Sequence, residues 1–272
     1  MFNMNEIVGK NDILFITFDT LRYDVAINEM ESGRTPNLKK LLPDSWEKRH
    51  SPGNFTYASH HAFFAGFLPT PVSPGIHDRL FAVSFPGSES ISPNTCVFKT
   101  SSIVTGLAGE GYHTACIGGV GFFNKMSPLG SVFPDMFHES HWHRSYGVTD
   151  PDSTENQVKC ALDIIEKRNN SNPEQRLFLF INISALHQPN CFYLNYGKKD
   201  TIESHAAALG YVDSKLPELV SAFENRGDTF MILSSDHGTT YGEDGYTGHR
   251  LSHENVWDVP FASFLHKGNS HD

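Results

Sequence analysis

The sequence is poor in cysteine, in long apolar runs and in positive charge. Its four cysteines (Cys96, Cys116, Cys160 and Cys191) contain no CxxC pair, which favours reduced thiols and a cytoplasmic protein. No window of 18 apolar residues occurs, and the N-terminus lacks a basic segment followed by an apolar one. We therefore expect neither a membrane span nor a secretory signal. The formal net charge of −10 argues against a nucleic-acid partner.

Three short apolar runs stand out in the 272 residues, of which 39% are hydrophobic. They cover residues 13–18, 177–183 and 230–234, and each is followed by polar residues, as expected of strands buried on both faces. We expect these strands to lie side by side and parallel at the centre of one sheet. Because the chain is long enough for one large core and has no internal repeat, we expect a single domain over residues 1–272.

Helical patterns alternate with these strands. Thr35 and Pro36 suit the cap and the first position of a short helix. Further helices are expected at residues 102–109, 155–168 and 204–225, a last strand at 259–265, and loops at 67–95 and 119–152. The fold class predicted by this alternation is α/β, with a largely parallel central sheet flanked by helices on both faces.

Polar residues with metal-binding side chains follow the three central runs. Asp19 follows the first run, His187 the second, and the pair Asp236-His237 the third, while Thr56 opens an expected helix. Ligands of open α/β sheets gather beyond the carboxyl ends of the strands. Asp19, Thr56, Asp236 and His237 therefore form a coherent ligand set for one divalent ion. Taken alone, Asp236 would equally suit a turn cap and His237 a surface position.

Four segments, in this order, resemble the alkaline phosphatase/sulfatase superfamily. They are ITFDTLRYD at 16–24 followed by TPNL at 35–38, FTYASHHAFFAGFLP at 55–69, the strand and loop at 177–189, and SDHG at 235–238 followed by VP at 259–260. The resemblance covers most of the chain. It implies an alkaline phosphatase-like fold and a metal-dependent enzyme acting on phosphate or sulfate esters.

The nucleophile segment departs from the sulfatase pattern. Thr56 occupies the position of the Cys or Ser that sulfatases convert to formylglycine, and Ala58 and His60 replace their Pro and Arg. Thr20 stands where sulfatases have a second Asp, and Gly119 where they have a Lys. These departures argue against formylglycine chemistry.

The closing segment is similar to that of phosphoethanolamine transferases and lipoteichoic acid synthases. In those enzymes a His lies thirteen residues after the SDHG Asp, which matches His249 after Asp236, and a phosphate-binding His matches His187. They also use a Thr nucleophile, as Thr56 would be here. Because they are membrane-anchored and this sequence shows no such helix, their lipid substrate does not carry over.

The resemblance implies a hydrolase or transferase that forms a phospho-Thr56 intermediate on a small-molecule phosphate ester. His187 and His249 would hold the phosphoryl oxygens or protonate the leaving group, or would bind a second ion. Arg22 would contact the anion or pair with Asp24. Zn²⁺ or Mn²⁺ is favoured by the mixed O and N ligands, with Mg²⁺ and Ca²⁺ as alternatives.

Two other functions stay open: a sulfatase-like hydrolase without formylglycine, and a non-catalytic binder of a phosphorylated ligand. We further expect residues 119–152 to cover the active site and His60 and His61 to lie on a helix surface. Asp213 is expected to be a solvated or capping carboxylate. The sequence does not indicate an oligomeric state.

Overall fold

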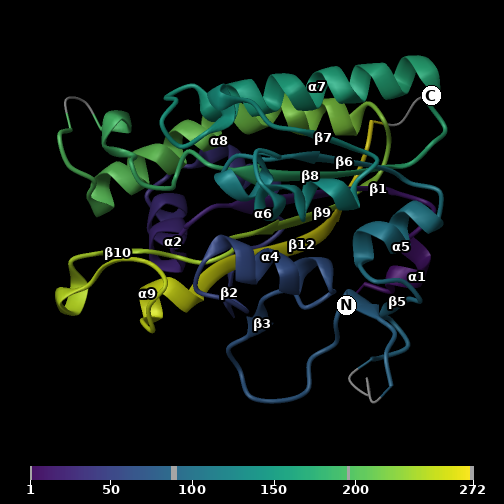
Figure 1. Cartoon of the computed structure of the whole chain (residues 1–272), viewed down its shortest axis with the longest axis horizontal. Coiled ribbons are helices and arrows are strands. Elements are labelled where there is room, and N and C mark those ends of the chain that lie inside the picture. The colour runs from purple at the N-terminus through teal and green to yellow at the C-terminus, as the bar shows by residue number, and fades with distance from the viewer. Residues whose placement is uncertain (1, 87–90, 195–196, 270–272) are drawn as a thin grey trace.

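The computed structural model describes residues 2–86, 91–194 and 197–269. Its centre is an eight-stranded sheet with helices on both faces (Figure 1). The strands, in their order across the sheet, are β3 (Thr70–Pro71), β2 (Glu47–His50), β12 (Asp258–His266), β9 (Thr229–Ser234), β1 (Asp12–Phe18), β8 (Leu177–Ile183), β6 (His113–Ile117) and β7 (Glu139–His141). This arrangement confirms the predicted fold class.

The three predicted central strands are adjacent and parallel. β1 pairs in parallel with β9 on one side and with β8 on the other, and β6 and β7 continue the parallel region. β12 is antiparallel to β9, and β2 and β3 extend that antiparallel edge. All residues of β1, β8 and β9 are buried, because helices cover both faces of the sheet there.

Alternate residues of β1 pack into two hydrophobic cores, one on each face of the sheet. Leu14, Ile16 and Phe18 pack against one set of helices, which are α2 (Tyr23–Glu31), α3 (Pro36–Leu41), α7 (Ser153–Ser171) and α8 (Ile202–Glu224). Ile13 and Phe15 point to the opposite face, covered by α1 (Met4–Ile7), α4 (Thr56–Phe64) and α5 (Ile103–Gly109). α7 and α8 run along one face in Figure 1, with α4 on the other.

The remaining elements are short. They are α6 (Pro128–Ser131), α9 (Glu254–Trp257), the strand pairs β4 (Phe81–Val83) with β5 (Cys96–Phe98) and β10 (Thr240–Tyr241) with β11 (Thr247–Gly248), and 3-10 turns at Gly121–Phe123, Pro134–Met136, Arg144–Tyr146, Cys191–Tyr193 and Glu243–Gly245. β3 and β4 fall inside 67–95, which we predicted to be a loop throughout. No helix in the described part of the chain is long and apolar enough to cross a membrane.

The cap of α3 differs from the prediction. Thr35 is the N-cap residue, but its side chain makes no capping hydrogen bond. Instead Asp213 of α8 accepts hydrogen bonds from the backbone N–H groups of Leu38 (2.7 Å) and Asn37 (3.2 Å). A carboxylate from a distant helix therefore satisfies the first turn of α3, and no local pattern could reveal it.

Replacing this carboxylate should destabilise the protein. Asp213→Ala removes the acceptor of one buried and one partly buried N–H group, so we expect the free energy of unfolding to fall by about 1–3 kcal/mol in urea titrations. Asp163→Ala, at an exposed position of α7, is the control and should change it by less than about 0.5 kcal/mol. Equal effects of both substitutions would contradict the assignment of Asp213 as the cap of α3.

Candidate active site

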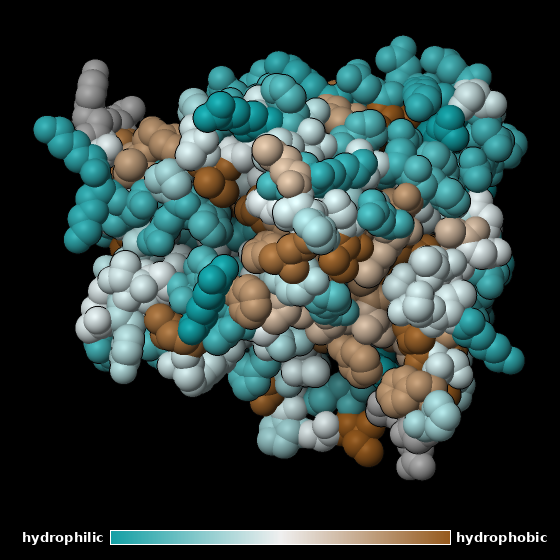
Figure 2. Space-filling model, in the orientation of Figure 1, coloured by the Kyte–Doolittle hydropathy of each residue, from teal (hydrophilic) through white to brown (hydrophobic). Residues whose placement is uncertain are grey.

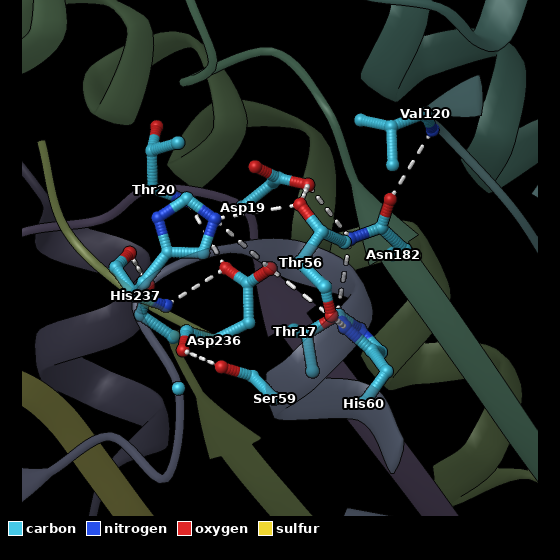
Figure 3. Close-up of polar contacts among 12 residues, drawn as sticks. Thr17, Asp19, Thr20, Thr56, Ser59, His60, Val120, Asn182, Asp236 and His237 are labelled. Atoms are coloured by element: carbon cyan, nitrogen blue, oxygen red, sulfur yellow. Dashed lines mark hydrogen bonds and ion pairs between the residues drawn. The ribbon is translucent and has the colours of Figure 1, made fainter. Parts of the chain in front are cut away.

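The parallel strands bring the predicted ligands to one edge of the sheet. Phe18 of β1 is level with Ile183 of β8, and Thr17 with Ser234 of β9, so the three strands end together. Asp19 follows β1 directly, and Asp236 and His237 follow β9. Thr56 is the first residue of α4, whose N-terminus faces them (Figure 3).

Two carboxylates and an imidazole converge there, and one oxygen of each carboxylate has no hydrogen-bond partner. Asp19, Asp236 and His237 are fully buried, and each offers one atom within 4.8 Å of those of the other two. Oδ1 of Asp19 and Oδ2 of Asp236 accept no hydrogen bond. Nδ1 of His237 lies 2.8 Å from the Gly238 carbonyl and donates to it, which leaves the Nε2 lone pair free. Buried carboxylates without partners are costly, so this donor set fits a divalent cation.

Thr56 lies beside this set. Its hydroxyl Oγ1 is 3.4 Å from Oδ2 of Asp19 and 3.4 Å from Nε2 of His237. The side chain is 3% exposed, and it lines a cavity of about 410 Å³. The four predicted metal-set residues therefore come together, with the predicted nucleophile between the ligands and the cavity.

Backbone groups fix the second carboxylate. Oδ1 of Asp236 accepts from the N–H groups of Thr20 (3.2 Å) and His237 (3.0 Å). Thr20 has a φ of 66°, a left-handed conformation that turns its N–H toward Asp236. The hydroxyls of Ser51 and Ser59 donate to the Asp236 carbonyl, the latter at 2.6 Å. Thr20 thus contributes its backbone at the position where sulfatases have a carboxylate.

Burial changes the proton affinity of these ligands. Desolvation, and secondarily the charge of Asp236, raises the pKa of Asp19 to about 6. Desolvation raises the pKa of Asp236 to about 7. Desolvation also lowers the pKa of His237 to about 4, so its imidazole is neutral at pH 7. Near neutrality a cation therefore competes with protons for the carboxylates and not for the imidazole.

Metal affinity should consequently rise with pH. Between pH 6 and 8 the ion-free site loses the protons of Asp19 and Asp236, whose raised pKa values lie at or near this window. The apparent affinity should increase up to about tenfold for each proton displaced per pH unit. Titration calorimetry in buffers of different ionisation enthalpy would measure both affinity and proton release. Affinity and proton release that do not change with pH would contradict this assignment.

The two other predicted histidines line the same cavity. The ring centroid of His249 lies 5.4 Å from that of His187 and 4.5 Å from that of His237. Desolvation, followed by the charges of His237 and His187, lowers the pKa of His249 to about 3. Within the described ranges, no second cluster of three His, Cys, Asp or Glu ligands satisfies the 4.8 Å criterion, so a second ion gains no support.

Residues 119–152, which we expected to form a loop covering the active site, supply much of the cavity wall but also contain α6 and β7. This segment contributes Gly119, Val120, Gly121, Phe122, Trp142, Arg144, Gly147, Val148 and Thr149. Two cations in the lining, Arg144 and Arg250, were not predicted; both are exposed, and neither forms an ion pair with another residue that the structure describes. Arg250 directly follows the predicted site residue His249, and this position in the sequence could have identified it. A larger hollow of about 650 Å³ between α2 and α8 contains none of the predicted site residues.

Arg22 does not line the cavity. Its guanidinium is buried between Asp24 (2.6 Å) and Glu243, which corresponds to the alternative that pairs it with Asp24. With both carboxylates in place the guanidinium is neutralised, so its predicted contact with the substrate gains no support. Asp244 pairs with His253 at 3.2 Å, away from the ligand set.

His60 contradicts its predicted surface position. It is fully buried one turn after Thr56, whereas His61 is exposed as predicted. Asn182 was missed altogether. Its Nδ2 donates to Oδ2 of Asp19 at 3.2 Å. A polar residue inside the apolar run 177–183 was the signal that could have identified it.

Comparison with known proteins identifies the fold and the family of the chain. Three solved structures share the fold: the C-terminal periplasmic domain of the phosphoethanolamine transferase EptC from Campylobacter jejuni (16% identity, TM-score 0.61, covering 97% of this chain and 83% of that one), the lipoteichoic acid synthase LtaP from Listeria monocytogenes (15%, 0.60, 97% and 67%), and the soluble domain of lipooligosaccharide phosphoethanolamine transferase A from Neisseria meningitidis (15%, 0.60, 94% and 76%). No curated protein sequence matches the chain significantly. The model of the Sulfatase family matches residues 11–263. The chain therefore belongs to the sulfatase family, within the alkaline phosphatase/sulfatase superfamily.

Proposed function

We propose that this protein is a metal-dependent hydrolase or transferase of phosphate esters in which Thr56 is the nucleophile. One observation carries the proposal: the buried side chains of Asp19, Asp236 and His237 converge beside a buried hydroxyl that faces a cavity, and one oxygen of each carboxylate accepts no hydrogen bond. The names of the transferases that share the fold support the inclusion of group transfer beside hydrolysis.

Asp19, Asp236, His237 and Thr56 would hold the ion. A bound divalent cation supplies positive charge that lowers the pKa of a coordinated hydroxyl and offsets charge on the ester. The mixed carboxylate and imidazole ligands favour Zn²⁺ or Mn²⁺. Asp19 orients the Thr56 hydroxyl by accepting its hydrogen bond at Oδ2.

Thr56 would attack the phosphorus atom. A bond forms between Oγ1 and phosphorus, and the bond from phosphorus to the leaving alcohol breaks, which gives phospho-Thr56 and the alcohol. Water or a second alcohol then takes the phosphoryl group and regenerates the hydroxyl. Hydrolysis and transfer differ only in this acceptor.

The cavity suits an anion. His249 is neutral at pH 7, so it would hold a phosphoryl oxygen as an N–H donor rather than act as an acid before substrate binds. His187 lies beside it and would bind the same group or protonate the leaving oxygen. Arg144 and Arg250 add positive charge to a protein of net charge −10.

Sulfate esters are the second candidate, because the family model is that of sulfatases. Threonine cannot be converted to formylglycine, so a sulfatase of this kind would need a different nucleophile chemistry. A non-catalytic binder is the third reading. The complete donor set with its neighbouring hydroxyl favours catalysis over binding alone, and the threonine favours phosphate esters over sulfate esters.

Metal analysis and turnover assays separate these functions. We expect the purified protein to bind about one Zn²⁺ or Mn²⁺ and to hydrolyse an aryl phosphate monoester or diester faster than the aryl sulfate. Faster sulfate hydrolysis would favour the second candidate. Metal binding without turnover of any ester would favour the binder. A cytoplasmic location and the absence of nucleic-acid and membrane partners remain predictions from composition.

A further inference from the structure

A closed ring of hydrogen bonds joins the nucleophile to Asp19 (Figure 3). From the Thr56 carbonyl it passes to Nδ1 of His60 (2.7 Å), and from Nε2 of His60 to Oγ1 of Thr17 (3.2 Å). It continues from Thr17 to Nδ2 of Asn182 (3.3 Å) and on to Oδ2 of Asp19 (3.2 Å). The hydroxyl of Thr56 closes it by donating to the same Oδ2 at 3.4 Å.

The partners of His60 and Asn182 determine where their hydrogen atoms lie, whereas the Thr56 hydroxyl is 3.4 Å from both Oδ2 of Asp19 and Nε2 of His237. Nδ1 of His60 faces a carbonyl and must carry the proton, so Nε2 accepts from the Thr17 hydroxyl. The two N–H bonds of Asn182 go to Thr17 and Asp19. Its oxygen accepts from the N–H groups of Gly119 and Val120, both at 3.3 Å, which fixes the amide orientation. The ring therefore uses a neutral imidazole.

The surroundings of His60 favour this neutral form. Five phenylalanine rings have centroids 5.4–6.1 Å from its own: Phe63, Phe64, Phe123, Phe133 and Phe180. The side chain is fully buried, so a charge there would be poorly solvated. Nδ1 of His60 also lies 3.7 Å from Oδ2 of Asp236, which is beyond hydrogen-bond distance.

The ring connects three separate elements. Thr56 and His60 belong to α4 and lie one turn apart, Thr17 belongs to β1, and Asn182 belongs to β8. These bonds join the helix that carries the nucleophile to β1, in addition to the apolar packing and to the hydrogen bond from Ser59 of α4 to the Asp236 carbonyl. Hydrogen bonds to metal ligands from outside the ligand set commonly matter about 10- to 100-fold for metal affinity or activity.

We propose that His60 is a positioning residue, which sets the Thr56 hydroxyl against Asp19 through Thr17 and Asn182 and leaves Oδ1 of Asp19 directed at the ion. The inference rests on the proposed function. It assigns His60 no proton transfer with the substrate. It also gives the histidine a positioning role at the place where sulfatases have an arginine.

Matched substitutions test the ring. His60→Phe fills the same aromatic pocket without either hydrogen bond, and Thr17→Val removes one hydroxyl at nearly constant volume. We expect each to lower kcat about 10- to 100-fold with little change in KM, and to weaken Zn²⁺ or Mn²⁺ binding measured by calorimetry without substrate. Thr17→Ser keeps the hydroxyl and should retain most of the wild-type kcat and metal affinity. His61→Phe, the same change at the next, exposed position, should leave both quantities unchanged.

The double variant gives the decisive comparison. Because both residues act through one ring, His60→Phe combined with Thr17→Val should be no worse than the more damaging single variant. Losses that multiply, or variants with wild-type kcat and metal affinity, would overturn the inference while leaving the proposed function intact. A wild-type protein without metal binding or turnover would instead refute the proposed function. Thr17→Val keeps the test valid if His60→Phe does not fold.

Discussion

Thr56→Ala should abolish ester turnover while the protein stays folded. Oγ1 is the atom that would form the bond to phosphorus, so its loss removes the covalent route and should cost orders of magnitude in kcat. The structural cost should be small. Thr56 is the first residue of α4, after the N-cap residue Phe55. Its hydroxyl contacts Asp19 and His237, and both contacts are 3.4 Å long, so their loss should cost little. We expect the free energy of unfolding to change by about 1 kcal/mol or less.

Thr56→Ser is the matched control. It keeps the hydroxyl and loses one methyl group, so it should retain part of the activity in the same steady-state assay. An alanine variant as active as the wild type would mean that water attacks the ester directly. Thr56 would then be only a ligand or a structural residue.

Asp236→Asn should remove metal binding and turnover together. The substitution preserves shape but replaces the unpartnered Oδ2 or the backbone-bonded Oδ1 with an uncharged amide group that cannot neutralise a cation. We expect stoichiometric metal binding to be lost by elemental analysis, and kcat to fall at least about 100-fold. A chelator should inactivate the wild-type protein in the same way, with recovery on adding Zn²⁺ or Mn²⁺.

Asp244→Asn controls for a change of charge. Asp244 follows Asp236 in the same loop region, but it is exposed, and its ion pair is with His253. This variant should bind metal and turn over substrate like the wild type. If Asp236→Asn kept its metal and its activity, the ligand assignment would be wrong.

The sequence predicts the centre of the fold well because its strands are buried on both faces. Uninterrupted apolar runs are the direct signature of such strands, and the polar residues that end them mark the sheet edge where ligands gather. Asp19, Asp236 and His237 were found in this way. The start of α4 at Thr56 followed from the local pattern and from the resemblance.

Other features were beyond local patterns. α4 (TYASHHAFF) is apolar around most of its circumference, so periodicity could not tell which histidine faces inward, and His60 was placed wrongly. Arg22 pairs with Glu243 across 221 positions, and Asp213 caps α3 across 175, so neither contact leaves a trace in local spacing. The cations Arg144 and Arg250 reach the cavity from a single 3-10 turn and from a loop, which are too short or too irregular for periodicity to indicate the side-chain direction.

The surface around the site is mixed in character. Figure 2 shows apolar side chains among polar ones on the face that carries α4 and α6. Phe122, Trp142 and Val148 add apolar lining to the cavity beside Arg144 and Arg250. A phosphate ester with an apolar or aromatic alcohol would match both kinds of lining, so aryl esters are suitable first substrates.

Anomalous scattering from crystals grown with Zn²⁺ or Mn²⁺ tests the central claim most directly, because it locates the ion without reference to activity. The account predicts one ion about 2–2.5 Å from Oδ1 of Asp19, Oδ2 of Asp236, Nε2 of His237 and Oγ1 of Thr56. An ion more than about 5 Å from Asp236, beyond any coordination distance, would contradict the account.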